Sequence, residues 1–204
     1  MKKWLIGLTV CAAYSSPLVA QVGAPNGSGV AMGHVHMNVQ DVEAHKNFWV
    51  ELGAIPVRVG TAQAVKMDGV LVVFREQAPD GPMGGSVINH LGVLVPQFEV
   101  LRAHLERSGI KMDPVRAGSG DMRQSSAFGP DGFRIELTEN PALTRGLASH
   151  HLHYNLADPA AAQQWYEQTL KVTPGTRAGW TAGDVPGMNL TYGIIPEGGT
   201  TPVQ

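Results

Sequence analysis

The stretch GHVHMNVQD, residues 33–41, introduces the pattern on which the rest of this chain is built. The pattern returns as NHLGVLVPQ at residues 89–97 and as HHLHYNLAD at residues 150–158. Each copy is a short apolar run with a histidine near its start. Seven residues after that histidine comes a position at which a helix is expected to begin. These histidines, spaced 56 and 61 residues apart, are His34, His90 and His151. A period of this size is typical of one small supersecondary unit repeated along the chain.

Helix and strand signals give the first two copies the order β-α-β-β-β and the third copy a partial version of it. In the first unit we expect a strand over 30–39, a helix opened by Asp41 and ended by Gly53, and strands near 57–59, 62–67 and 70–76. The second unit repeats this order, with a strand over 88–95, a helix over 96–108 and strands near 112–116, 123–128 and 133–139. The third has a strand over 151–156, a helix from 158 to about 170, and strands near 180 and 188–194. Asp68-Gly69 and Asp131-Gly132 are hairpin-turn signals at matching places in the first two units.

The domain organisation follows from these units. Residues 30–142 form two paired modules, 30–79 and 86–142, separated by a linker rich in Pro and Gly, and residues 149–204 form a third, partial module. We predict an α+β fold in which repeated βαβββ modules make a cup-shaped mixed sheet with helices outside, and in which the third module is unpaired. Such a chain is either a shortened relative of a four-unit protein or borrows a partner, so a homodimer is a further expectation.

The N-terminus has the features of a secretory signal peptide. Residues 1–20 combine the positively charged Lys2 and Lys3, an apolar stretch, and a final segment with the small residues of a cleavage region. Residues 21–29 are a flexible, Gly-rich leader. An uncleaved N-terminal anchor is the alternative. We therefore expect a secreted or periplasmic protein with no membrane attachment after cleavage. Because the only cysteine is Cys11, the mature chain has no disulfide and no thiolate metal ligand.

The charge balance argues against a nucleic-acid partner. The chain has 15 Lys and Arg against 17 Asp and Glu, and no run of basic residues stands out. With no thiolate available, a metal ion has to be held by His, Asp or Glu.

Alternation along the strands predicts which polar side chains share the inner face. His34 and His36 lie on one face of the first strand, His90 on the equivalent face of the next copy, and Glu136 opposite the apolar residues of its strand. Two imidazoles and one carboxylate suffice to bind a divalent metal and leave positions open for a substrate. We predict His34, His90 and Glu136 as ligands and His36 as a proton-transfer residue. Taken singly, a histidine such as His90 is more often a core residue with its hydrogen bonds satisfied, and a carboxylate such as Glu136 more often part of a polar strand face. The alternative for His34 and His36 is that they are surface residues on an edge strand.

Two other features bear on this site. Val73 occupies in the first unit the place that Glu136 has in the second, so we expect three protein ligands rather than four. His151 would be half of a second, incomplete site in the third unit.

Together the motifs resemble the vicinal oxygen chelate superfamily, which includes glyoxalase I, bleomycin-resistance proteins and extradiol dioxygenases. The resemblance rests on residues 34–41, on 89–92 and on the stretch GPDGFRIEL at 129–137. It implies paired βαβββ modules around a divalent metal bound by His34, His90 and Glu136, with Fe(II) as first choice and Zn, Mn or Ni as alternatives. It also implies a small substrate with adjacent oxygens, and dioxygenase-like or glyoxalase/lyase-like chemistry. The alternative function is a ligand-binding cup without catalysis, as in bleomycin resistance.

Overall fold

The computed structural model describes residues 23–81, 83, 86–118, 120, 122–144 and 146–195. The predicted signal peptide, residues 1–20, and the start of the leader lie outside this range. Within the described residues, no helix combines the length and apolar character that a membrane crossing requires.

The chain folds into three βαβββ units, and the third, predicted from the sequence to be partial, has all three strands after its helix. The first unit contains β1 (His34–Val39), α1 (Val42–Glu51), β2 (Ile55–Val59), β3 (Ala62–Met67) and β4 (Val70–Glu76). The second contains β5 (Ile88–Val95), α2 (Phe98–Arg107), β6 (Lys111–Met112), β7 (Arg116–Ala117), β8 (Arg123–Phe128), the 3-10 turn η2 (Pro130–Gly132) and β9 (Arg134–Glu139). The third contains β10 (Ala148–Leu156), α3 (Pro159–Leu170), β11 (Thr173–Arg177), β12 (Trp180–Val185) and β13 (Met188–Ile194).

Local sequence signals explain where the helices and turns lie. Asp41 and Asp158 cap α1 and α3, because their carboxylates accept hydrogen bonds from Ala44 N at 3.0 Å and Ala161 N at 2.9 Å. Asp131 and Gly132 both have positive φ, 55° and 70°, as a tight turn between two strands requires. The predicted strand near 112–116 is instead the two short strands β6 and β7.

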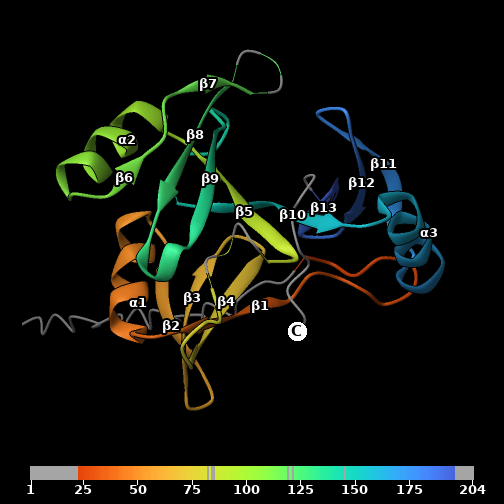
Figure 1. Ribbon diagram of the computed structural model, residues 1–204, viewed down its shortest axis with the longest axis horizontal. Helices are drawn as coiled ribbons and strands as arrows, with labels where there is room; N and C mark the ends of the chain where they lie inside the picture. Colours follow the sequence, from red (N-terminus) through yellow and green to blue (C-terminus); the bar gives the residue numbers. More distant parts are fainter. Residues whose placement is uncertain are drawn as a thin grey trace, which may run out of the picture.

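The strands form two sheets. One has four strands in the order β1-β4-β3-β2, and the other has nine, with the path β11-β12-β13-β10-β5-β9-β8-β6 and β7 beside β8. The first unit therefore forms one sheet alone, while the second and third units share the other (Figure 1).

The pairing of the units corrects one expectation from the sequence. The third unit is not unpaired: β10 runs antiparallel to β5, with His151 opposite Gly92 and His153 opposite His90. The five strands of the second unit and the four of the third thus meet edge to edge through β5 and β10 and form one curved, open sheet. The first unit is the one left without such a partner in the described part of the chain.

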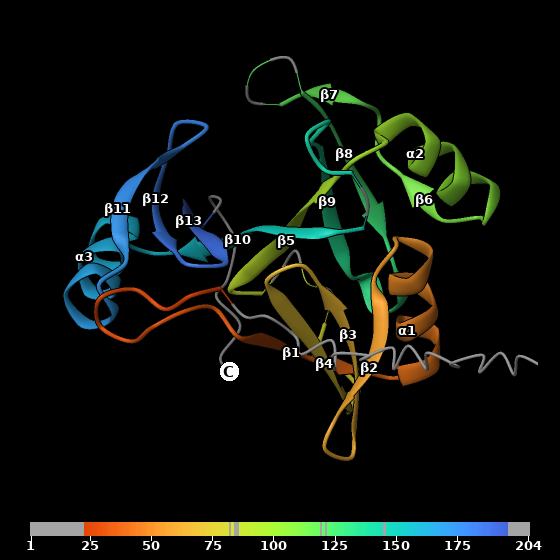
Figure 2. The same cartoon turned by 180° about the vertical axis from the view of Figure 1, so that it is seen from behind.

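The first unit is attached to the second through its helix rather than through a strand edge. Phe48 and Trp49 of α1 are buried against Phe133, with ring centroids 6.0 and 5.4 Å away. Asp131 accepts hydrogen bonds from Gln40 N at 2.8 Å and shares a 3.0 Å contact with His45 Nε2. The two views of the ribbon show α1 next to β9 and the third unit on the opposite side of β5 (Figures 1 and 2).

Candidate metal centre

The candidate site is built around one glycine at the centre of the nine-stranded sheet. Gly92 on β5 pairs with His151 on β10 and with Glu136 on β9, and His90 lies two residues earlier on the same face. The three side chains therefore project from three adjacent strands toward one point. A Cβ on Gly92 would lie far inside the van der Waals radii of the His151 ring, so the absence of a side chain here makes room for that imidazole.

The donor atoms lie close together and are shielded from solvent. His90 Nε2 is 3.0 Å from His151 Nε2, and the Glu136 carboxylate oxygens are 3.7 Å and 3.6 Å from these two nitrogens. All three residues are buried. His153 adds a third imidazole, since the donor atoms of His90, His151 and His153 lie within 4.8 Å of one another.

Hydrogen bonds to the other ring nitrogens orient the two buried imidazoles. His90 Nδ1 is 2.7 Å from Asn89 Oδ1, which can only accept, so His90 carries its proton on Nδ1 and has a lone pair on Nε2. His151 Nδ1 lies 3.3 Å from His150 Nδ1 and can donate to it when Nε2 is deprotonated. In metal-binding histidines, a hydrogen-bond partner on the ring nitrogen that does not bind the metal fixes the orientation of the ring.

Burial keeps these histidines neutral. Desolvation, followed by the charges of His153 and the nearby arginines, lowers the pKa of His90 to about 2. Burial also lowers the pKa of His151 well below its usual range, and lowers those of His150 and His153 to about 4. Because a metal ligand must be unprotonated, these imidazoles are ready to bind at neutral pH.

The observed spacing fits one divalent ion. Two nitrogens at about 2.1 Å from the same ion and about a right angle apart are separated by roughly 3.0 Å. The distance between His90 Nε2 and His151 Nε2 agrees with this value. Neutral imidazoles with a carboxylate on the third side are also the donor types that Fe, Zn, Mn and Ni accept. His90, His151 and Glu136 therefore fit a metal ion.

The site opens into a cavity of about 780 Å³. Three arginines line it, and two of them contact Glu136: Arg116 forms an ion pair with Oε2, and Arg177 Nη2 lies 3.5 Å from Oε1. Burial lowers the pKa of Arg177. Arg134 donates to Asn89 Oδ1 at 3.2 Å.

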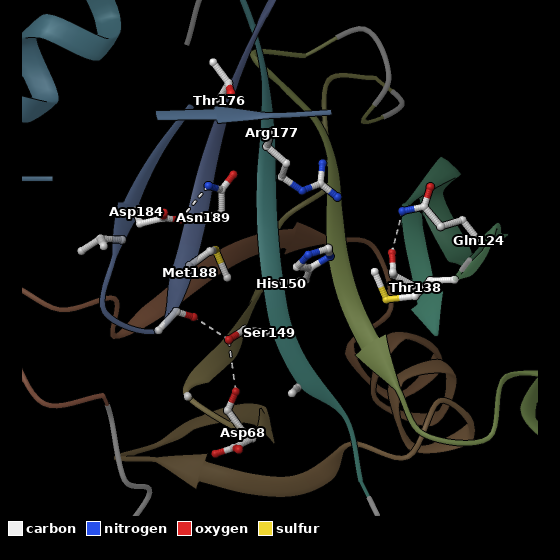
Figure 3. A pocket seen from close by; sticks show the side chains of 15 residues that line it. Asp68, Gln124, Thr138, Ser149, His150, Thr176, Arg177, Asp184, Met188 and Asn189 are labelled. Carbon is white, nitrogen blue, oxygen red and sulfur yellow. Dashed lines mark hydrogen bonds between the residues drawn. The ribbon is translucent and has the colours of Figure 1, made fainter. Parts of the chain in front are cut away.

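A second cavity, of about 540 Å³, adjoins the first. Gln124 and Arg177 line both cavities. Figure 3 shows Arg177 and the ring of His150 facing this second space, with Gln124 hydrogen-bonded to Thr138 across from them. The two cavities therefore meet at Gln124 and Arg177, and both of these side chains contact Glu136.

The structure brings together two of the three ligands predicted from sequence. His90 and Glu136 meet, but His34 lies on β1 of the four-stranded sheet and is exposed. His36 is also exposed on β1, and its ring centroid is 4.8 Å from that of His34. In the described part of the chain, β1 is the edge strand of the four-stranded sheet and no other unit pairs with it. His34 and His36 therefore do not reach the cluster formed by His90, His151 and Glu136.

The strand registers explain this outcome. Val73 pairs with His36 as Glu136 pairs with Gly92, which confirms that Val73 occupies the position of the carboxylate in the first unit. The partner that completes the site is His151, the third copy of the same histidine. The repeat identified His151 as part of a site, but the sequence assigned it to a separate, incomplete one.

Comparison with known proteins identifies the family. The sequence matches the family described as "Glyoxalase/Bleomycin resistance protein/Dioxygenase superfamily" over residues 31–137, more than half of the chain. The chain belongs to this superfamily. No curated protein sequence matches it.

Solved structures support the same fold. The crystal structure of glyoxalase I from Zea mays is similar with a TM-score of 0.61 and 16% identity, covering 83% of this chain and 68% of that one. A point mutant of the same maize enzyme gives a TM-score of 0.59 and 15% identity, covering 83% and 69%. At this level of identity the likeness concerns the superfamily fold and not the reaction.

Proposed function

We propose that this member of the superfamily is a metal-dependent enzyme that acts on a small substrate with two adjacent oxygens. His90, His151 and Glu136 would hold the ion. The observation that carries the proposal is the convergence of these three buried side chains, with two neutral imidazole nitrogens 3.0 Å apart.

A three-ligand site leaves room for substrate. In the third unit, Thr191 pairs with His153 as Glu136 pairs with Gly92, so the place of a fourth ligand is taken by a buried threonine hydroxyl. Two imidazoles and one carboxylate with open positions are typical of non-haem Fe(II) oxygenases, which makes Fe(II) our first choice and Zn, Mn or Ni the alternatives. When bound, the ion supplies Lewis acidity and a template for two vicinal oxygens.

The remaining residues orient the ligands and handle a proton. Asn89 and His150 contact the Nδ1 atoms of His90 and His151 and hold the rings in place. His153 lines the cavity, with its ring centroid 4.9 Å from that of His90. It occupies in the third unit the position that His36 has in the first, and we propose it as the residue that accepts or donates a proton at the substrate.

The reaction is proposed as either dioxygenase-like or glyoxalase/lyase-like, and the metal distinguishes them. The decisive measurement is the metal content of residues 21–204 purified without air, beside a Glu136→Ala variant. About one ion per chain, lost in the variant, would support the site. Iron would favour dioxygen chemistry, whereas zinc, nickel or manganese would favour an isomerase or lyase.

A ligand-binding cup without catalysis is the second candidate. It is favoured by the ion pairs that Arg116 and Arg177 make with Glu136, since these neutralise the carboxylate without any metal. Absence of metal uptake by the anaerobically purified protein would favour this function over the enzyme.

A homodimer is also proposed, through the first unit. β1 is an edge strand of its sheet in the described part of the chain, although the equivalent strands β5 and β10 pair with each other. An antiparallel β1–β1 contact between two chains would repeat that pairing. A mass of two chains in solution is expected, and a single-chain mass at every concentration measured would contradict it.

A further inference from the structure

The cavity beside the candidate metal centre has a strong excess of positive charge. Arg116, Arg134 and Arg177 line it, and among the lining residues that the structure describes Glu136 is the only carboxylate. The three guanidinium groups come from β7, β9 and β11, so they surround the cavity from both halves of the nine-stranded sheet. Such an excess inside a recess attracts an anionic ligand.

Two of the arginines pair with this carboxylate, and one of them, Arg177, is largely buried. The Arg177 side chain is only 16% exposed and lies 3.5 Å from Glu136 Oε1, and Arg116 pairs with Oε2. A buried guanidinium requires a charged or hydrogen-bonding partner, because desolvation without compensation is costly.

Arg134 has only neutral partners among these contacts. It donates to Ser126 Oγ and Asn89 Oδ1, both at 3.2 Å, and none of the ion pairs within 4.0 Å in the described part of the chain involves it. Its charge adds to those of Arg116 and Arg177 without a matching carboxylate.

Metal binding would change this balance, because Glu136 cannot serve the ion and both arginines fully. We propose that the substrate is a small organic carboxylate, whose carboxylate group takes the place of Glu136 as partner of Arg116 and Arg177. This inference rests on the proposed metal site. The planar fork of arginine matches a carboxylate, and two such forks on one group favour an anion over a neutral molecule.

The rim of the cavity indicates the rest of the substrate. Trp180 and Ile194 line it, are 41% and 59% exposed, and Trp180 lies 5.3 Å from His153 between ring centroids. An exposed aromatic ring beside polar groups suits a flat apolar body. The substrate class is therefore a small carboxylic acid with an apolar or aromatic body and two adjacent oxygens.

The test compares two probes that share vicinal oxygens and differ in one carboxylate: 3,4-dihydroxybenzoate and catechol. Calorimetric titration of zinc-loaded residues 21–204 should show 3,4-dihydroxybenzoate binding about 10- to 100-fold more tightly, the range expected for hydrogen bonds between charged groups. Arg116→Gln and Arg177→Gln should each reduce this preference without changing the zinc content. The matched control is Arg75→Gln, which alters an exposed arginine at the end of β4. Equal affinities for the two probes, or a preference that survives both cavity variants, would overturn the proposal.

Two further arms keep the result interpretable. Arg116 is 41% exposed, so its replacement tests the proposal even if Arg177→Gln fails to fold. In metal-free Glu136→Gln, Arg116 and Arg177 lose their anionic partner, and 3,4-dihydroxybenzoate should bind more tightly than to the metal-free wild type. Absence of zinc uptake by the wild type together with this gain in Glu136→Gln would reject the metal site and retain the anion site, whereas zinc binding by the wild type without any carboxylate preference would do the reverse.

Discussion

His90 Nε2 lies 3.0 Å from His151 Nε2, although 61 positions separate the two residues in the sequence. The contact exists because the first strands of the second and third units pair antiparallel, so that equivalent histidines of two repeats face each other. The Glu136 carboxylate closes the third side. This relationship makes the second and third units, rather than the first and second, the pair that builds the candidate site.

The choice between His151 and His34 is directly testable. His151→Ala should lower the affinity for Zn²⁺ or Fe²⁺ by at least about 10- to 100-fold, because changes even behind the direct ligands of metal sites cost that much. His34→Ala should leave the affinity unchanged, since His34 is exposed on the other sheet. Metal affinity measured by chelator competition distinguishes the two. A loss in His34→Ala with none in His151→Ala would restore the ligand set predicted from sequence.

Gly92 should tolerate no side chain. In Gly92→Ala the added Cβ would overlap the His151 ring, so we expect a loss of about 1–3 kcal/mol in unfolding free energy and weaker metal binding. Gly175→Ala on β11 is the control, because its Cβ would meet nothing within 4 Å. Chemical denaturation and metal titration of both variants check this prediction. Normal metal binding by Gly92→Ala would contradict the placement of His151.

The metal-free protein should lose stability as the pH falls below 6.5. Burial lowers the pKa of His90 to about 2, so the folded state keeps this ring neutral while the unfolded chain, with a histidine pKa of about 6.5, takes up a proton. The stabilisation is present above pH 6.5 and is lost as the pH falls toward the lowered value. At pH 5 the loss is up to about 2 kcal/mol for one such histidine.

Denaturation midpoints in a chelator at pH 7.5 and pH 5 measure this effect. Carboxylates also titrate in this range, so the comparison is with His90→Gln, which should lose about 2 kcal/mol less than the wild type between the two pH values. An equal loss in both proteins would show that His90 is not held neutral by burial.

Asp131 should be important for joining the first two units. It accepts a hydrogen bond from Gln40 N and contacts His45 Nε2, and its φ of 55° is one that aspartate and asparagine tolerate better than alanine. Asp131→Ala should therefore reduce the unfolding free energy by about 1–3 kcal/mol. Asp131→Asn keeps an acceptor oxygen and the turn preference, and should lose less. Thermal unfolding of the two variants provides the measurement, and equal losses would argue against the acceptor role.

The sequence by itself determined the units of this protein. The periodic apolar residues, the caps Asp41 and Asp158 and the turn at Asp131-Gly132 act within a few residues, so they could be recognised without the fold. The repeat also identified His90 and Glu136, and it placed Val73 at the position that Glu136 has in the second unit, because the register within a unit follows from strand alternation and turn position.

Only the tertiary structure decided which units pair. All three first strands are apolar and carry the same histidine, so strand chemistry alone does not choose a partner for β5. The choice depends on packing between distant segments: Phe48 and Trp49 bind the first unit to Phe133 through its helix, and the edge of β5 is left for β10. Contacts of this kind join residues far apart in the chain and leave no local signal. His151 therefore replaces His34 at the candidate site.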